Sequence, residues 1–223
     1  MDMWSGMENS KPSIYSVRKK GHASMPMTSK DPEEVTPADH IPGPKQGEWT
    51  YSHYAALPDD GNRYEIINGV LYMAPSPDTA HQHIALWISI HLAMYVEETN
   101  QLGNVFTAPL DVKLFQDTVV QPDVLVILNE HKERISKHVI GAPDLVVEVL
   151  SSRTKRYDRQ QKQHIYACAG VAEYWIVDPI KKDVEVLVLE GENYLSTGIF
   201  SVNQTLQSKL LPDFSIQIKQ FFR

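Results

Sequence analysis

Two spacings of apolar residues alternate along the chain from Trp49 onward. Short runs rich in β-branched and aromatic residues predict strands, whereas longer segments with apolar residues three and four positions apart predict helices. The predicted strands are 63–67, 70–73, 105–115, 119–128, 144–150, 173–177, 184–189 and 194–200. The predicted helices are 50–57, 79–99 and 157–169, and an apolar run at 212–222 closes the chain.

Turn-forming residues separate these segments. Asn68-Gly69 lies between two β-rich runs, which is a strong local signal for a hairpin. Gly170 predicts the end of a helix, and Gly191-Glu192-Asn193 predicts a turn between the last two strands. These signals place one hairpin near the N-terminal end of the folded part and another near its C-terminal end.

The order of the elements predicts one α/β domain over residues 47–223. The strands come in adjacent groups with helices between the groups, which favours a central mixed sheet flanked by helices over a regular alternation of strand and helix. Residues 1–46 are rich in Ser, Pro, Met and Lys and show neither spacing. This stretch is therefore predicted to be a flexible leader.

Composition limits the classes of function. The chain has 21 basic and 28 acidic residues and a formal net charge of -7, which argues against a protein that coats nucleic acid non-specifically. A nuclease is still possible, because a bound metal supplies positive charge locally. Cys168 is the single cysteine, which suits a reduced, cytoplasmic setting and excludes an intramolecular disulfide. No apolar run is long enough to cross a bilayer, so no membrane is expected.

Two carboxylates interrupt strands that are otherwise apolar at consecutive positions. Asp123 lies in the run 119–128 and Glu148 lies in the run 144–150. A carboxylate in such a strand is costly unless it is paired, hydrogen-bonded or bound to a cation, and Mg²⁺ commonly uses one or two carboxylates. A shared metal ion is the leading interpretation, and hydrogen-bonded or salt-bridged strand ends are the alternative.

Further acidic and histidine side chains could join this site. Glu65 in the first hairpin could complete the metal shell, directly or through water, or form a cross-strand ion pair. His81 could act as an auxiliary ligand or substrate contact, with a capping or surface role as the alternative. Asp144 shares a strand face with Glu148 but lies about 13 Å away along the strand, where a turn or cap role is expected.

A basic segment follows Glu148 in an otherwise acidic chain. Asp158, Lys162 and Tyr166 recur at every fourth position and therefore lie along one stripe of the predicted helix. If this stripe folds back over the strand end, Lys162 could stabilise the charge of a phosphate or help to position the attacking water. The alternative is a solvated ion pair between Asp158 and Lys162.

The order of these motifs resembles that of a known family. Pro122-Asp123, Glu148-Val149-Leu150 and Lys162 resemble the PD-(D/E)xK nuclease superfamily, and more closely the Uma family of putative restriction endonucleases. The stretches that carry the resemblance are 63–69, His81, 121–124, 147–151, 158–162, Tyr166, 169–179 and 211–214.

The resemblance implies a restriction-endonuclease-like fold with a central mixed sheet. It also implies that Asp123 and Glu148 bind Mg²⁺ or Mn²⁺, with the Val149 carbonyl as a further ligand. Leu150 stands two residues after Glu148, where the broad superfamily has a lysine, so the basic role passes to Lys162 on the helix, as in this family.

These observations favour a metal-dependent endonuclease that hydrolyses phosphodiester bonds in DNA. Asp123, Glu148, Lys162 and Glu65 are the predicted catalytic residues, and a homodimer is expected if both strands of a duplex are cut. The alternatives are a non-catalytic nucleic-acid-binding or regulatory domain with the same fold, and an unrelated α/β protein whose buried carboxylates are merely paired.

Overall fold

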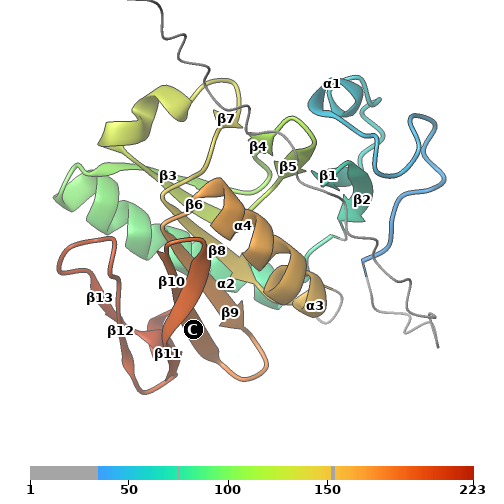
Figure 1. Ribbon diagram of the computed structural model, residues 1–223. Helices are drawn as coiled ribbons and strands as arrows, with labels where there is room; N and C mark the ends of the chain where they lie inside the picture. Colours follow the sequence, from blue (N-terminus) through green and yellow to red (C-terminus); the bar gives the residue numbers. More distant parts are fainter. Residues whose placement is uncertain (1–34, 75, 152–153) are drawn as a thin grey trace, which may run out of the picture. The chain divides into compact units, whose positions relative to one another are not determined.

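The computed structural model describes residues 35–74, 76–151 and 154–223, and in this part of the chain the strands form three sheets (Figure 1). The largest sheet has six strands in the order β11-β10-β9-β8-β6-β3. Its strands are β3 (Gly103–Thr107), β6 (Val124–Leu128), β8 (Leu145–Val149), β9 (Glu173–Asp178), β10 (Asp183–Glu190) and β11 (Asn193–Ser201). Strands β8 and β9 are parallel and the other neighbours are antiparallel, which confirms the predicted mixed sheet.

Helices cover both faces of this sheet. One face packs against α2 (Thr79–Ala93), which continues into the π-helical turn η1 (Met94–Thr99). The other face packs against a helical segment made of α3 (Lys155–Tyr157), η3 (Asp158–Lys162) and α4 (Gln163–Ala169). Figure 1 shows α4 in front of the sheet and α2 behind it.

Burial on both faces explains why the strand sequences are apolar at consecutive positions. Val147 belongs to the core on the α2 side, whereas its neighbour Val146 belongs to the core on the α4 side, because successive side chains of a strand point to opposite faces. Both core residues are completely buried. Gly170 ends α4 in the left-handed conformation at φ 86°, as the sequence predicted.

A second, five-stranded sheet has the order β2-β1-β5-β4-β7. Its strands are β1 (Arg63–Ile67), β2 (Val70–Ala74), β4 (Val112–Phe115), β5 (Thr118–Val120) and β7 (Val139–Ile140). Asn68 and Gly69 connect β1 to β2 with φ values of 51° and 75°, and Ile67 pairs with Val70 across them. The predicted hairpin is confirmed, because these positive φ values are those that an Asn-Gly turn provides.

Two predicted strands were wrong in one respect, since each divides between the two large sheets. The run 105–115 separates into β3 and β4, and the run 119–128 separates into β5 and β6. The second division falls at Gln121-Pro122, where proline has no N–H to donate to a strand ladder. The chain therefore passes from the five-stranded sheet to the six-stranded sheet immediately before Asp123, which places this residue where the two sheets meet.

The remaining elements are short. They are α1 (Tyr51–Tyr54), η2 (Asn129–Arg134), β12 (Thr205–Gln207), β13 (Ser215–Gln217) and η4 (Ile218–Gln220). The helix predicted over 50–57 is thus confined to one turn. The closing apolar run 212–222 is not one element, because it contains β13 and η4. In the described part of the chain, none of the helices is both long and apolar enough to span a membrane.

Residues 35–46, the last part of the predicted leader, lie against β2. The Ala38 N–H donates to the Leu71 carbonyl at 2.8 Å, and the Leu71 N–H donates to Gln46 Oε1 at 2.8 Å. Ala38 is buried in a small cluster with Trp49 and Leu71. Residues 1–34, the larger part of the predicted leader, lie outside the described residues.

Candidate active site

Asp123, the residue directly before β6, lies opposite Glu148 of β8. Strands β6 and β8 are antiparallel, with Val124 opposite Val147, so one step further along the two strands Asp123 comes opposite Glu148. Side chains at such positions have Cβ atoms about 4.5–5.5 Å apart. The Val149 N–H donates to Asp123 Oδ2 at 2.8 Å, which fixes the Asp123 carboxylate against the end of β8.

One cavity of about 310 Å³ collects the candidate residues. The residues of the sequence prediction that line it are Glu65, His81, Asp123, Glu148, Val149 and Lys162. They come from β1, from the first turn of α2, from the junction before β6, from β8 and from η3. The structure therefore brings together six residues that lie between Glu65 and Lys162 in the sequence.

Lys162 is the buried cation of this cavity. Its Nζ lies 3.0 Å from Glu65 Oε1, 3.0 Å from Glu148 Oε1 and 3.8 Å from Asp158 Oδ1. Burial alone would lower the pKa of Lys162, but the Glu148, Glu65 and Asp158 carboxylates outweigh it and raise the pKa well above its usual range. Lys162 therefore stays charged, and the solvated i,i+4 pair that was the alternative for Lys162 and Asp158 is excluded because both side chains are buried.

Of the two candidate metal ligands Asp123 and Glu148, Glu148 is the more buried, with 3% of its surface exposed. Burial raises the pKa of Glu148 well above its usual range, although Lys162 opposes the shift. The Tyr166 hydroxyl donates to the same Oε1 at 2.6 Å. Two donors thus hold one oxygen of Glu148 in place.

Glu65 faces Lys162, not a cross-strand partner. In the β1–β2 hairpin its register partner is Tyr72, which is neutral, so the cross-strand ion pair considered from the sequence is absent from this hairpin. The Gln121 N–H donates to Glu65 Oε1 at 2.7 Å, and the Tyr157 hydroxyl approaches Oε2 at 3.4 Å. Glu65 therefore orients Lys162 from the side of the five-stranded sheet.

His81 reaches the cavity from the start of α2. Its N–H donates to the Asp78 carboxylate that caps the helix, at 2.8 Å, and its Nε2 lies 3.1 Å from Asp123 Oδ2. Burial lowers the pKa of His81, but hydrogen bonding and charge from Asp123 outweigh burial and raise the pKa. The capping role considered for His81 belongs to Asp78. The His81 side chain instead contacts the candidate metal ligand Asp123.

Asp158 and the tyrosines around Lys162 were not assigned roles from the sequence. Asp158 lines the same cavity, and burial raises its pKa to about 7 despite the opposing charge of Lys162. The stripe of Asp158, Lys162 and Tyr166 was visible in the sequence, but a helical stripe does not show which strand it faces. Tyr157, whose ring lies 5.6 Å from Lys162 Nζ, lies off that stripe and gave no signal.

The donor atoms of this site fit a hard divalent cation. Among the described residues, the hydrogen bonds and ion pairs recorded for Asp123 and Glu148 go to Oδ2 and Oε1. Oδ1 of Asp123 and Oε2 of Glu148 are therefore available as ligands. The Val149 carbonyl is the third candidate, although it also lies close enough to His81 to raise the pKa of that imidazole. Carboxylate and carbonyl oxygens suit Mg²⁺ and Mn²⁺ better than softer metals.

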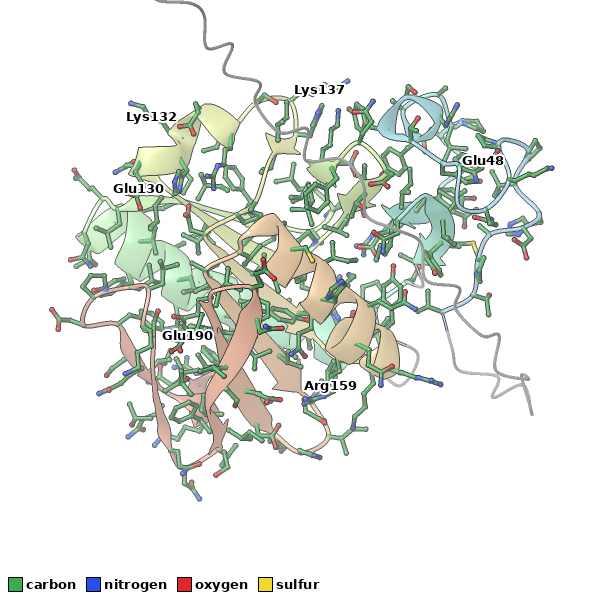
Figure 2. The ribbon with its side chains drawn as sticks, in the orientation of Figure 1. Glu48, Glu130, Lys132, Lys137, Arg159 and Glu190 are labelled. Carbon is green, nitrogen blue, oxygen red and sulfur yellow. The ribbon has the colours of Figure 1, made fainter. Side chains whose placement is uncertain are left out.

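Other basic residues of the helical segment are engaged elsewhere. Arg159, labelled in Figure 2, lies with Nη1 2.6 Å from Glu185 Oε2, and Lys155 Nζ lies 3.2 Å from Asp178 Oδ2. Both acids belong to the β9–β10 hairpin, so these two cations hold the helical segment to the sheet. Arg153 lies outside the described residues.

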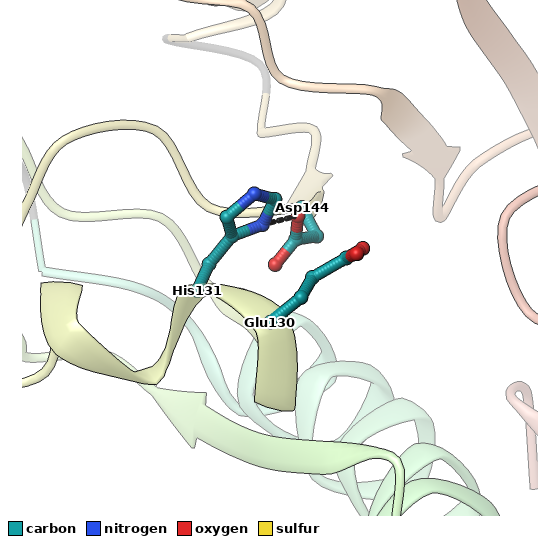
Figure 3. Close-up of side chains that lie close together, drawn as sticks. All are labelled: Glu130, His131 and Asp144. Carbon is teal, nitrogen blue, oxygen red and sulfur yellow. Dashed lines mark hydrogen bonds and ion pairs between the residues drawn. The ribbon is translucent and has the colours of Figure 1, made fainter.

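A second group of potential metal ligands lies at the opposite end of β8. Glu130, His131 and Asp144 bring one ligand atom each within 4.8 Å of one another (Figure 3). Asp144 Oδ1 pairs with His131 Nδ1 at 2.6 Å, and Asp144 Oδ2 accepts the Leu128 N–H at 2.7 Å. Both oxygens of Asp144 thus hold η2 to the end of β6, which gives Asp144 the turn-stabilising role that the sequence predicted.

The fold is shared with a solved structure. A crystal structure described as a putative nuclease belonging to DUF820 from Anabaena variabilis superposes with a TM-score of 0.66 at 20% sequence identity. The match covers 78% of this chain and 97% of that chain. At this identity the likeness shows the fold alone, an α/β fold built on a central mixed sheet.

The family follows from the sequence itself. The model of the Uma2 family, described as "Putative restriction endonuclease", matches residues 51–219. The chain therefore belongs to the Uma2 family, which confirms the resemblance drawn from the motifs. No curated protein sequence matches the chain.

Proposed function

We propose that this protein is a metal-dependent endonuclease that hydrolyses phosphodiester bonds in DNA, with residues 47–223 as its nuclease domain. The observation that carries the proposal is the meeting of Asp123, Glu148 and Lys162 in one cavity. Opposed carboxylates next to a buried lysine supply both a place for a cation and a fixed positive charge. Family membership supports a nuclease-like activity independently of this geometry.

Asp123, Glu148 and the Val149 carbonyl are the groups that would hold Mg²⁺ or Mn²⁺. When bound, the ion supplies Lewis acidity toward a phosphate oxygen and lowers the pKa of a bound water. The Val149 N–H and His81 orient the Asp123 carboxylate through Oδ2, and Tyr166 and Lys162 orient Glu148 through Oε1. The chain thus holds both carboxylates in fixed positions before a substrate arrives, which is the preorganisation that such a site needs.

Lys162 has the second role in this proposal. Its ammonium is buried, charged and held by Glu65 and Glu148 at 3.0 Å each. A lysine in this position stabilises the negative charge that builds up on the phosphate during hydrolysis. Glu65 acts through Lys162 as a positioning residue. Asp123 raises the pKa of His81 against burial, so His81 would add positive charge near the same phosphate whenever it is protonated.

The test is a cleavage assay on supercoiled plasmid and on labelled linear DNA, with Mg²⁺, with Mn²⁺ and with EDTA. We expect cutting by the wild type with either metal and none with EDTA. Asp123→Asn and Glu148→Gln should abolish cutting, whereas Asp117→Asn, an exposed carboxylate in the β4–β5 turn, should cut normally. A labelled RNA of the same sequence tests the preference for DNA.

Two outcomes would contradict the endonuclease proposal. A wild type that binds DNA but leaves it intact with both metals would support the non-catalytic nucleic-acid-binding or regulatory alternative. Cutting that persists in both Asp123→Asn and Glu148→Gln would show that the reaction takes place elsewhere.

A further inference from the structure

A second cavity adjoins the candidate active site. It has a volume of about 540 Å³, and Arg63 and Gln121 line both cavities. Sites that enclose small organic molecules have volumes of roughly 300–1,000 Å³, so this space is large enough for a nucleobase with its sugar. Since Arg63 and Gln121 belong to both walls, a ligand in the second cavity would be next to one in the first.

Aromatic rings line the second cavity. Tyr51 and Tyr54 come from the short helix α1 and His138 comes from the loop before β7. The Tyr51 and His138 ring centroids lie 5.1 Å apart, and those of Tyr51 and Tyr54 lie 6.4 Å apart with an angle of 29° between the rings. All three side chains are partly exposed. Partly exposed aromatic rings beside a groove can stack an unpaired base on a free face. One face of the Tyr51 ring is already covered, since Lys113 Nζ lies 4.7 Å from its centroid, so a base would stack on the other side of the ring.

Hydrogen bonds fix a carboxylate in the wall of this cavity. Asp111 Oδ1 accepts the Tyr54 hydroxyl at 2.7 Å and the Gln121 amide at 2.8 Å, while Gln121 Oε1 accepts Arg63 Nε at 2.8 Å. An ionised carboxylate has about four acceptor sites, and within the described residues two are used at Asp111. The remaining sites can accept the amino group of cytosine or adenine, whereas thymine has no amino group to donate.

Positive charge lies on both sides of the second cavity. In the described part of the chain, Arg63 uses one of its five N–H donors, on Gln121. Its other donors suit a phosphate between the two cavities, because the planar guanidinium matches phosphate oxygens in pairs. Lys137, labelled at the top of Figure 2, lines the cavity on the side of the β7 loop.

We propose that the second cavity binds one unpaired nucleobase of a DNA strand, stacked on Tyr51 and read by Asp111. Arg63 binds the phosphate that links this nucleotide to the one in the candidate active site. The inference rests on the proposed function, and it narrows the substrate to strands with an unpaired base, either single-stranded or extruded from a duplex. It also gives the strand a base preference, with cytosine and adenine ahead of thymine.

The experiment measures binding without cleavage. Fluorescence anisotropy in EDTA compares 12-residue oligonucleotides of deoxycytidine, deoxyadenosine and thymidine with a blunt duplex. The wild type should bind the first two more tightly than the other two. Tyr51→Ala should weaken single-strand binding by about tenfold, the effect of losing one base–aromatic stack, and should leave duplex binding unchanged. Phe115→Ala, an exposed aromatic on β4 outside both cavities, is the matched control.

Asp111→Asn tests the reading of the base separately from the stacking. Asparagine both donates and accepts, so the ratio of deoxycytidine to thymidine affinity should fall toward one while single-strand binding persists. Thermal melts check that each variant folds, and His138→Ala replaces Tyr51→Ala if the latter does not fold.

The inference is overturned if Tyr51→Ala and His138→Ala bind single strands as the wild type does. It is equally overturned if the wild type binds the thymidine oligonucleotide as tightly as the deoxycytidine one. A wild type that binds single strands through Tyr51 but cuts no DNA would refute the nuclease proposal and support the base site. Metal-dependent cutting that does not respond to Tyr51→Ala, on single-stranded and duplex DNA alike, would refute the base site and leave the nuclease proposal intact.

Discussion

The ammonium of Lys162 lies 3.0 Å from Glu148 Oε1, although the two residues are 14 positions apart in the chain. Both side chains are almost fully buried. Glu65 and Asp158 approach the same ammonium, so three carboxylates share one lysine. Such an excess of buried negative charge is relieved by taking up protons or by binding a further cation. The candidate metal site therefore also has an electrostatic reason to bind a cation.

Replacing Lys162 tests this arrangement. Lys162→Ala removes the shared partner of three buried carboxylates, and breaking a buried ion pair from one side costs about 3–5 kcal/mol. We expect a loss of that size in the free energy of unfolding at pH 8, together with loss of cleavage, and partial recovery of stability when Mg²⁺ is added. Urea denaturation with EDTA and with Mg²⁺ measures both effects.

Lys155→Ala provides the comparison. Lys155 pairs with Asp178, and the Lys155 side chain is 48% exposed. Asp178 is buried, but it keeps the hydrogen bonds from the Ile180 and Lys181 N–H groups when Lys155 is removed, so the loss should be smaller, on the order of 1 kcal/mol. Equal losses in the two variants would show that the buried ion pairs of Lys162 stabilise the fold no more than the pair of Lys155 does, which would contradict the prediction.

Residues 35–46 provide a test at the other end of the chain. Two versions are compared, one beginning at residue 35 and one beginning at residue 47. The second lacks the Ala38 and Gln46 hydrogen bonds to Leu71, so its free energy of unfolding should be lower by about 1–3 kcal/mol. Chemical denaturation of both proteins measures the difference. Identical midpoints and slopes would show that residues 35–46 contribute nothing to the fold.

Local sequence signals predicted those parts of the fold that depend on local physics. The Asn68-Gly69 hairpin, the stop at Gly170 and the two-sided burial of β8 each follow from a few neighbouring residues. The division of 105–115 and 119–128 between two sheets does not, because both halves of each run have the same β-rich composition. Only the packing of distant segments decides which sheet each half joins.

The candidate site was predictable for a related reason. Asp123 and Glu148 stand out because a carboxylate in an apolar strand needs a partner, and the family pattern then connects them to Lys162. Asp158 was marked as part of the helical stripe with Lys162 and Tyr166, but a stripe does not show which strand it faces. Nothing in the sequence marked Tyr157, because aromatic residues are ordinary in such a segment. The second cavity was invisible for the same reason, since Tyr51, Asp111 and His138 are far apart in sequence.

Metal binding should stabilise the fold through Asp123. A ligand that binds only the folded state adds about 2.7 kcal/mol at one hundred times its dissociation constant. Thermal melts with EDTA and with millimolar Mg²⁺ or Mn²⁺ should show this shift in the wild type. Asp123→Asn should lack it, because the variant loses a charged ligand, while Asp117→Asn should keep it. A melt of the wild type that ignores both metals would remove the support for the metal site.

The pH dependence of stability should reveal Asp158. Burial raises its pKa to about 7 against the pull of Lys162, whereas an aspartate in the unfolded chain titrates near about 3.9. Between these values the folded protein keeps a proton that the unfolded chain has lost. The contribution of Asp158 to the free energy of unfolding therefore falls as the pH rises from about 4 to about 7, and it is level above that.

Asp158→Asn removes this titration and leaves a neutral side chain of nearly the same shape. Any constant effect of the substitution is the same at every pH, so the change with pH reports the proton of Asp158 together with its effect on the pKa of Glu148. The stability of Asp158→Asn relative to the wild type should therefore increase between pH 5 and pH 8, measured by urea denaturation in EDTA so that no metal competes for the site. A difference that stays constant over this range, or that moves in favour of the wild type, would mean that Asp158 is ionised throughout and that Lys162 compensates fully for its burial.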